Sequence, residues 1–253
     1  MVWKELNYER MNDKEKSQIV TEVNILRELQ HKHIVQYHDR HIDKKNQTIY
    51  IIMEYCGGGD LQKIIKRCLQ NKEQINEEFV WKVFAQIVSG LQYCHCRGSS
   101  AARSGDKPQK ILHRDLKPGN ILLDSKNDVK LGDFGLARIL NTDSVFAQTH
   151  VGTPYYMSPE QINEQHYNEK SDIWSLGCVI YELCALRPPF KATTHYNLAL
   201  KIKEGKFARI PATYSDELWH CIQSLIKLKP EHRPSIDEIL TLPRVQRHLN
   251  SSS

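Results

Sequence analysis

The chain has 253 residues and a mass of 29.5 kDa, which is enough for one large domain or two smaller lobes. Its composition is ordinary, with 40% hydrophobic and 26% charged residues, and this excludes collagen-like, disordered and low-complexity classes. The formal net charge is only +5 at pH 7, with the basic residues scattered along the chain. This weak excess predicts no direct binding to nucleic acid.

The cysteines and the apolar segments indicate the compartment. The seven cysteines are an odd number in a long chain, and the first residues do not form a basic-then-apolar leader. The most apolar stretches, residues 49–53 and 173–186, are interrupted by polar residues and are shorter than the ~20 apolar residues that span a membrane. We therefore expect reduced thiols in a soluble, intracellular chain without a membrane partner.

The N-terminal segment has strand and helix patterns. A strand is expected at residues 2–6, followed by a helix that begins near Asn12 and ends near residue 30. Apolar residues at Ile19, Val23, Leu26 and Leu29 lie on one face of this helix. Further strands are expected at residues 35–37 and 48–54, with a turn at 43–46.

The remaining chain is predicted to be mainly helical. Residues 56–59, Cys-Gly-Gly-Gly, interrupt regular structure, and Asp60 is expected to cap a helix that ends near residue 69. A longer helix is predicted from Asn76 to residue 93, and short strands at 121–124 and 129–132. Helical patterns continue from residue 160 onwards. The prediction is an α+β fold with a small strand-rich lobe, a Gly-rich hinge and a larger helical lobe.

Three motifs follow one another in the second half of the chain. They are HRDLKPGN at residues 113–120, DFG at 133–135 and SPE at 158–160. Asp115 is followed by a lysine two residues later and an asparagine five residues later, and a second acid, Asp133, comes thirteen residues after that asparagine. A solvated loop that holds these residues by chance is the alternative, but their order and spacing are specific to protein kinases.

Phosphoryl transfer explains these residue types, because it depends on positioning and charge neutralisation. Asp115 would accept the proton of the substrate hydroxyl, and Lys117 would neutralise charge on the migrating phosphoryl group. Asn120 and Asp133 offer the hard oxygen ligands that Mg²⁺ prefers. The motifs therefore predict ATP and Mg²⁺ as cofactors.

Longer segments resemble the NIMA-related serine/threonine protein kinases of the centrosomal, mitotic type over essentially the whole chain. The resemblance is carried by six segments: VWKEL (2–6), EVNILREL (22–29), MEYC (53–56), VKLGDFGLARIL (129–140), VGTPYYMSPE (151–160) and YNEKSDIWSLGC (167–178). It implies a two-lobed α+β kinase fold with a partial N-lobe at 1–54, a hinge at 55–59, a C-lobe at 60–249 and a tail at 250–253. It also implies phosphorylation of protein Ser/Thr residues in cell-cycle regulation, in the cytoplasm, centrosome or nucleus.

The resemblance assigns further roles around the nucleotide. Lys4 matches the strand lysine that holds the α- and β-phosphates and pairs with a helix glutamate, here Glu22. The other matching residues surround adenine and ribose: Val2 as the roof, Met53 at the back, Glu54 and Cys56 in the hinge, Asp60 near the ribose and Leu122 as the floor.

Regulation and support of the loop are implied in the same way. Arg114 marks kinases whose activation segment is ordered by a phosphate, and Thr149 is the first candidate to carry it. Thr153 is expected to bond to the catalytic residues 115 and 117. In the family, Asp172 anchors the catalytic loop, and Arg233 forms a buried ion pair with Glu160.

Two clusters of metal-ligand residue types are interpreted otherwise. Cys94, His95 and Cys96 end a helical pattern and have no second ligand pair at zinc spacing, so core side chains are favoured over a metal site. Four histidines between residues 31 and 41 follow turns, where solvated histidines are common. A partner-docking role for the basic segment 97–110 stays open.

One departure from the family leaves two functions open. The family's Gly-rich loop should precede the strand lysine by about 15–20 residues, but Lys4 is the fourth residue. An incomplete N-terminal sheet with an exposed edge is therefore expected. The chain is then either an active kinase or a catalytically impaired kinase-like binding or scaffold module. Dimerisation through a tail outside this chain is also open.

Overall fold

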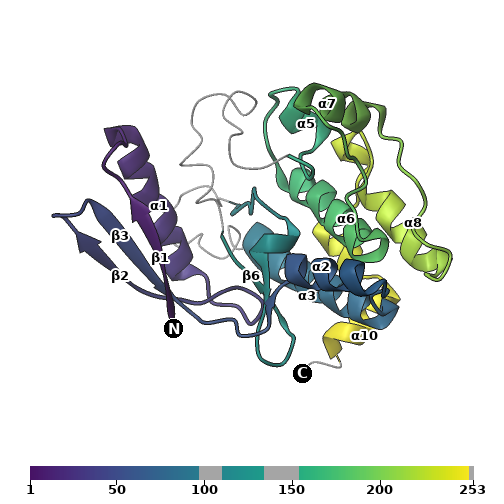
Figure 1. Cartoon of the computed structure of the whole chain (residues 1–253), viewed down its shortest axis with the longest axis horizontal. Helices are drawn as coiled ribbons and strands as arrows, with labels where there is room; N and C mark the ends of the chain where they lie inside the picture. The colour runs from purple at the N-terminus through teal and green to yellow at the C-terminus, as the bar shows by residue number, and fades with distance from the viewer. Residues whose placement is uncertain (97–109, 134–153, 251–253) are drawn as a thin grey trace.

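The computed structural model describes residues 1–96, 110–133 and 154–250, without the side chains of Lys14, Gln18, Thr21, Glu22 and Ile25. Figure 1 shows a strand-rich part, formed by the N-terminal residues, beside a larger and mainly helical part. The strands are β1 (Val2–Asn7), β2 (Tyr37–Asp43), β3 (Thr48–Met53), β4 (Gly59–Asp60), β5 (Ile121–Leu123) and β6 (Val129–Leu131). The helices are α1 (Asp13–Glu28), α2 (Leu61–Asn71), α3 (Glu77–Cys96), η2 (Pro118–Asn120), α5 (Pro159–Ile162), α6 (Glu169–Ala185), α7 (His195–Glu204), α8 (Asp216–Leu225), η3 (Pro230–His232), α9 (Ile236–Leu240) and α10 (Pro243–Asn250).

The N-terminal sheet has the antiparallel order β1-β3-β2. Lys4 lies opposite Ile51 in its register, so both side chains are on the same face of the sheet. Ile51 is fully buried on that face, whereas Trp3, on the other face, is 67% exposed. The buried positions of α1 belong to the same core as Ile51. The face that carries Lys4 is thus the inner face of the sheet.

One strand prediction is wrong. The strand expected at residues 35–37 begins only at Tyr37 and extends to Asp43. Its residues 38–42 are exposed, so no apolar alternation reveals the strand in the sequence. Val35 instead donates its N–H to the carbonyl of Leu131, at 2.9 Å, and so joins the N-terminal part to β6. The division of the chain at residue 54 stays a prediction.

The helix starts follow the capping residues. Asn12 caps α1 by accepting a hydrogen bond from the N–H of Glu15, and the Glu15 side chain bonds back to the N–H of Asn12. Asp60 caps α2 by accepting from the N–H of Lys63 at 2.8 Å, as expected. The ends agree less well with the prediction, because α1 stops at Glu28 and α3 continues to Cys96. Helix ends depend on tertiary contacts more than on local sequence.

The helical part is built around α3 and α6. Every residue of α6 from Ser171 to Cys184 is buried, because α2, α3 and α8 pack around it. The second sheet has the order β4-β5-β6, and its strand β6 lies against α3. Strands β5 and β6 connect the motif at residues 113–120 to Asp133. Among the described helices, none is both long and apolar enough to cross a membrane.

Close packing of α6 on α8 gives the first prediction. A Cβ atom built on Gly177 would lie 2.7 Å from a side-chain carbon of Ile226 and 2.8 Å from the Cβ of Leu225. The Leu225 Cβ cannot rotate away, so Gly177→Ala should lower the free energy of unfolding by about 1–2 kcal/mol despite the better helix propensity of alanine. Urea unfolding of the variant measures this loss.

Gly119→Ala is the control, because a Cβ atom there meets no atom within 4 Å. Its free energy of unfolding should stay within about 0.5 kcal/mol of the wild type. Equal stability of Gly177→Ala and the wild type would contradict the close contact between α6 and α8.

Candidate active site

Asp115 is the centre of a hydrogen-bonded cluster in the loop before β5. Its Oδ2 atom accepts from the Nζ of Lys117 at 2.8 Å and from the Nδ2 of Asn120 at 2.7 Å. The same Nδ2 atom also donates to the backbone carbonyl of Asp115 at 2.9 Å. Asn120 is one of the residues of η2 and is buried, so it holds the acid in one orientation. The structure therefore brings these three predicted residues together.

Asp133 joins this cluster from the end of β6. The carbonyl of Asn120 accepts from the N–H of Gly132 at 2.9 Å, so Asp133 follows directly after a residue bonded to the loop. Asp133 has φ 55°, a left-handed conformation that is unusual for a side-chain-bearing residue and is found at functional sites. Its Oδ1 atom contacts the Nζ of Lys4 at 2.7 Å. Lys4 thus reaches from the N-terminal sheet to the second motif.

The expected pairing of Lys4 with Glu22 lies outside the described side chains. The backbone of Glu22 belongs to α1, as expected, and the contact that the structure describes for Lys4 is the one with Asp133. The pairing with Glu22 stays a prediction.

Asp172, in the first turn of α6, holds the backbone of the catalytic loop in place, as the resemblance implies. Its two carboxylate oxygens accept from the N–H groups of His113 and Arg114 at 3.0 and 3.1 Å. Arg114 has φ 69°, a strained conformation that these two bonds stabilise. The side chains of His95, at 2.8 Å, and Tyr167 also bond to the carboxylate. The predicted anchor is therefore confirmed.

These donors decide the charge of Asp172. Burial by itself would raise the pKa of Asp172, but the hydrogen bond and the charge of His95 outweigh it and lower that pKa. Burial lowers the pKa of His113, and this outweighs the opposite effect of the nearby carboxylates of Asp172, Asp115 and Asp133. The loop therefore rests on an ionised, fully buried carboxylate.

Sequence reasoning missed two members of this network. The sequence indicates His95 only as one of three adjacent side chains for which the core is favoured over a metal site, and Tyr167 only as part of a longer segment. His95 is used instead as a partner of Asp172, while its neighbour Cys94 is buried in the core. The polar His95 among buried residues of α3 was the available signal, because a buried polar side chain needs a partner.

The predicted adenine-site residues lie on β1, β3, β5 and the segment that follows β3. Val2 lies opposite Met53 in the sheet, and Leu122 lies opposite Asp60 in the second sheet. One of the oxygens of Asp60 is already used as the cap of α2. The roles of these residues toward a nucleotide stay predictions.

An unpredicted ion pair holds the start of the hinge. The Glu54 carboxylate contacts the Nζ of Lys130 at 2.8 Å and accepts from the N–H of Gln36 at 3.2 Å. Next to it, burial, followed by the charge of Glu54, raises the pKa of the Cys56 thiol to about 11. Cys56 is therefore a protonated thiol at neutral pH, and the hinge is bonded to β6 through Lys130.

The donor set suits Mg²⁺. Because the amide nitrogen of Asn120 is bonded to Asp115, its Oδ1 oxygen is oriented as an acceptor for a cation. Asp133 has a second carboxylate oxygen beside the one that contacts Lys4. Two hard oxygen donors agree with Mg²⁺, which retains water molecules and phosphate oxygens in its remaining positions. Asn120 and Asp133 would hold the ion.

Arg233 and Glu160 form the predicted buried ion pair. Two guanidinium nitrogens of Arg233 donate to the two oxygens of Glu160 at 2.7 and 2.8 Å. Both side chains are nearly inaccessible, with exposures of 0% and 2%. Burial by itself would raise the pKa of Glu160, but hydrogen bonds from Arg233 and Ser171 outweigh it and lower that pKa. This expectation is confirmed.

The predicted regulatory residues are described only in part. Thr149 and Thr153 lie outside the described residues. Arg114 is described, and its side chain is exposed on the loop. The proposed ordering of the activation segment by a phosphate therefore stays a prediction.

The comparison with known proteins agrees with this geometry. Residues 1–244 match the family model described as the protein kinase domain. The chain belongs to the protein kinase domain family. The predicted α+β kinase fold is thereby confirmed, and ATP with a divalent metal ion is what this family uses in general.

The similar proteins include NIMA-related kinases. Serine/threonine-protein kinase Nek2 of Homo sapiens is 56% identical over 245 residues, which cover 97% of this chain and 54% of the relative. G2-specific protein kinase nimA of Emericella nidulans is 45% identical over 258 aligned positions, which cover 96% of this chain and 37% of the relative. The predicted resemblance is confirmed, and the chain spans about half the length of the Nek2 relative.

The buried ion pair gives a prediction with a pH dependence. Arg233→Met removes the guanidinium and leaves the Glu160 carboxylate buried, which should lower the free energy of unfolding by about 3–5 kcal/mol near neutral pH. In the wild type the Glu160 pKa is lowered, so the pair stabilises the fold above the ordinary value of 4.5, and this is lost as pH falls through the lowered pKa. In the variant the carboxyl protonates more readily. The difference from the wild type should therefore shrink between pH 7.5 and 5.5, as measured by urea unfolding.

Arg244→Met is a matched control. Arg244 contacts the exposed acids Glu78 and Glu217 at 2.8 and 3.2 Å. Because exposed pairs contribute little, its loss should cost no more than about 1 kcal/mol. Similar losses of unfolding free energy in Arg233→Met and Arg244→Met would contradict the prediction that the buried pair stabilises the fold more than an exposed pair does.

Proposed function

We propose that the protein is an ATP- and Mg²⁺-dependent serine/threonine protein kinase that transfers the γ-phosphoryl group to Ser/Thr hydroxyls of proteins. The observation that carries the proposal is the cluster of Asp115, Lys117, Asn120, Asp133 and Lys4. These residues come from three separate segments and are bonded to one another either directly or through the backbone of Gly132. The likeness to Nek2 and nimA supports the same reaction class.

Each residue of the cluster has a separate task. Asp115 is held in one orientation, so its carboxylate can accept the proton of a substrate hydroxyl. Lys117, bonded to that carboxylate, places a positive charge beside the path of the phosphoryl group. Lys4, whose ammonium group lies beside Asp133, would bind phosphate oxygens. Asn120 and Asp133 would hold Mg²⁺, which would neutralise the charge of the phosphate groups.

The alternative function, a kinase-like binding or scaffold module with impaired catalysis, is not favoured. Lys4 and Asp133 are 129 positions apart in the sequence, yet their side chains are in contact. A module used only for docking would not depend on this contact or on the orientation of Asp115.

Cell-cycle regulation is the proposed setting. The relative from Emericella nidulans is named a G2-specific protein kinase. We extend this to the present protein as a role in the cytoplasm, centrosome or nucleus. Protein substrates are the proposed partners, without direct binding to nucleic acid, and dimerisation would use a tail outside this chain.

Replacement of Asp115 tests the reaction. Asp115→Asn should lower kcat for transfer of radiolabelled γ-phosphate from ATP to casein by about 10²–10⁴-fold, because the amide cannot accept the hydroxyl proton. The binding of Mg·ATP, measured as a rise in Tm, should be retained. This combination distinguishes a catalytic loss from a folding defect.

Asp237→Asn, at an exposed position of α9, is the control and should keep the wild-type kcat. Equal rates for Asp115→Asn and the wild type would overturn the role of Asp115. A wild-type protein that neither transfers phosphate nor gains stability with millimolar Mg·ATP would favour the scaffold.

Phosphorylation of Thr149 is the proposed regulation. Thr149→Ala should reduce kcat, because a phosphate there would add about −1.5 to −2 charges that can bond to Arg114. Mass spectrometry of the active protein should find a phosphate on Thr149, and phosphatase treatment should reduce the rate of the wild type but not that of the variant. Unchanged turnover in Thr149→Ala would remove this proposal.

A further inference from the structure

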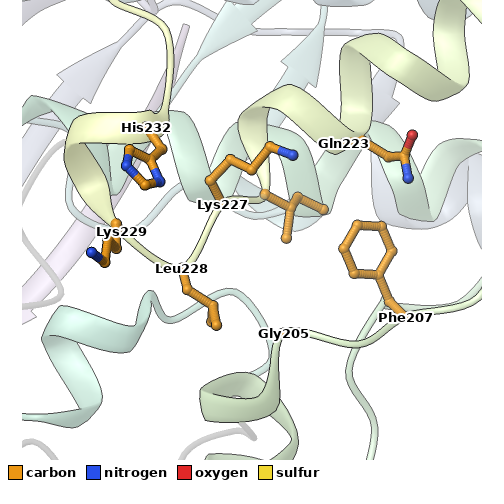
Figure 2. Close-up of a pocket in the computed structure, with 8 residues that line it drawn as sticks. Gly205, Phe207, Gln223, Lys227, Leu228, Lys229 and His232 are labelled. Atoms are coloured by element: carbon orange, nitrogen blue, oxygen red, sulfur yellow. The ribbon is translucent and has the colours of Figure 1, made fainter.

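The helical part has a pocket away from the catalytic loop. Its volume is about 380 Å³, and it lies between the ends of α7 and α8 and the start of η3 (Figure 2). The eight residues that line it include the apolar Phe207 and Leu228 and the basic Lys227, Lys229 and His232. None of them belongs to the cluster proposed for phosphoryl transfer, so the pocket needs a separate explanation.

One wall of the pocket is apolar and packs against buried aromatic side chains. The ring of Phe207 packs edge-on against Tyr181, Phe190 and Trp219, with centroid separations of 5.6–5.7 Å. Leu228 is 40% exposed, which is a large exposure for an apolar side chain. A Cβ atom on Gly205, which has φ 66°, would lie 2.8 Å from the Leu228 side chain, so the two residues are in tight contact.

The segment that carries Leu228 is fixed by the buried ion pair. Arg233 donates through Nε to the carbonyl of Lys227 at 2.7 Å and through Nη2 to the carbonyl of Leu228 at 3.1 Å. The guanidinium is held in turn by Glu160 and lies 5.0 Å from the centre of the Trp174 ring. The backbone of the pocket is therefore preorganised, which reduces the entropy lost on binding.

The rim of the pocket is basic. The side chains of Lys227, Lys229 and His232 are exposed, and the eight lining residues include no acid. Glu204 and Glu231 are close by in the sequence, but Lys203 and Lys206 balance their charge. Figure 2 shows the two lysines and the histidine along the segment that leaves α8, with Phe207 on the opposite side.

We propose that this pocket binds a short acidic segment of a partner protein. An apolar side chain of the segment packs between Phe207 and Leu228, and its carboxylates contact Lys227 and Lys229. Its volume of about 380 Å³ is comparable to that of a small-molecule pocket, which spans about 300–1,000 Å³, so it has room for the apolar side chain of the segment. An apolar centre with a charged rim is the usual composition of a protein-binding surface, and the sign of the rim selects an acidic partner.

A labelled peptide tests the proposal. The probe is a fluorescent decapeptide with a central Leu-Phe pair and two Glu-Asp pairs on each side, and binding is measured by fluorescence polarisation. The combined change Lys227→Glu and Lys229→Glu should weaken binding at least about tenfold, and a rise in salt from 50 to 300 mM should weaken binding to the wild type. Leu228→Ala, which keeps the charge, should weaken binding by about fivefold.

Matched controls separate the pocket from general charge attraction. The combined change Lys66→Glu and Arg67→Glu, at exposed positions of α2, makes the same change in net charge and should leave the affinity within about twofold. A peptide with alanines in place of the Leu-Phe pair and one with glutamines in place of the acids should both bind weakly. The charge-reversed pocket variant should keep the wild-type Tm and rate of phosphate transfer, which makes this test independent of the proposed function.

Three results would overturn the proposal. Equal affinity of the peptide for the wild type and for both pocket variants is the first. Self-association of the wild type that the pocket variants abolish, without peptide binding, would assign the surface to a second copy of the chain. Failure of a longer form of the protein to bind the peptide, when this chain binds it, would assign the pocket to a later segment of the same protein.

Discussion

A fully buried carboxylate organises the active site. Asp172 has no access to water, so its charge is stable only because backbone and side-chain donors surround it. Two of these donors are consecutive N–H groups of the catalytic loop, and they can both reach the carboxylate because Arg114 adopts a left-handed conformation. The requirement to satisfy one charge thus determines the backbone path that presents Asp115.

A second buried charge, that of Arg233, also holds the backbone of a neighbouring segment in place. Arg233 bonds to Glu160, which belongs to the short helix after residues 154–158, and to two carbonyls of the segment that lines the pocket. The pair therefore connects the motif at 158–160 with the basic pocket. Any change that moves Glu160 acts on the same guanidinium that positions Lys227 and Leu228.

The contact between Lys4 and Asp133 connects the N-terminal sheet to this frame. It is supported by the parallel pairing of Ile34 with Leu131 and by the ion pair of Glu54 with Lys130. Two of these contacts involve residues of β6, and the third involves Asp133, which lies two residues after that strand. Movement of the sheet relative to the helical part would therefore change the surroundings of Asp133, to which a role in metal binding is assigned here.

Local chemistry made part of this structure predictable. The caps at Asn12 and Asp60, the apolar face of α1 and the spacing of the motifs are all properties of short segments, and the structure agrees with each. The kinase family and the anchoring roles of Asp172 and Arg233 followed from the resemblance of longer segments. Strand β2 was placed wrongly, because its exposed polar residues have no alternating pattern.

Other features depend on contacts between residues far apart in the chain, which no local pattern encodes. The use of His95 and Tyr167 by Asp172, the contact of Lys130 with the hinge and the pocket beside Phe207 are of this kind. A single side chain can have many partners in the unfolded chain, and packing of the whole molecule selects one of them. Residue types and spacing thus indicated the chemistry of the site, whereas packing decided which side chains hold the catalytic loop and the hinge in place.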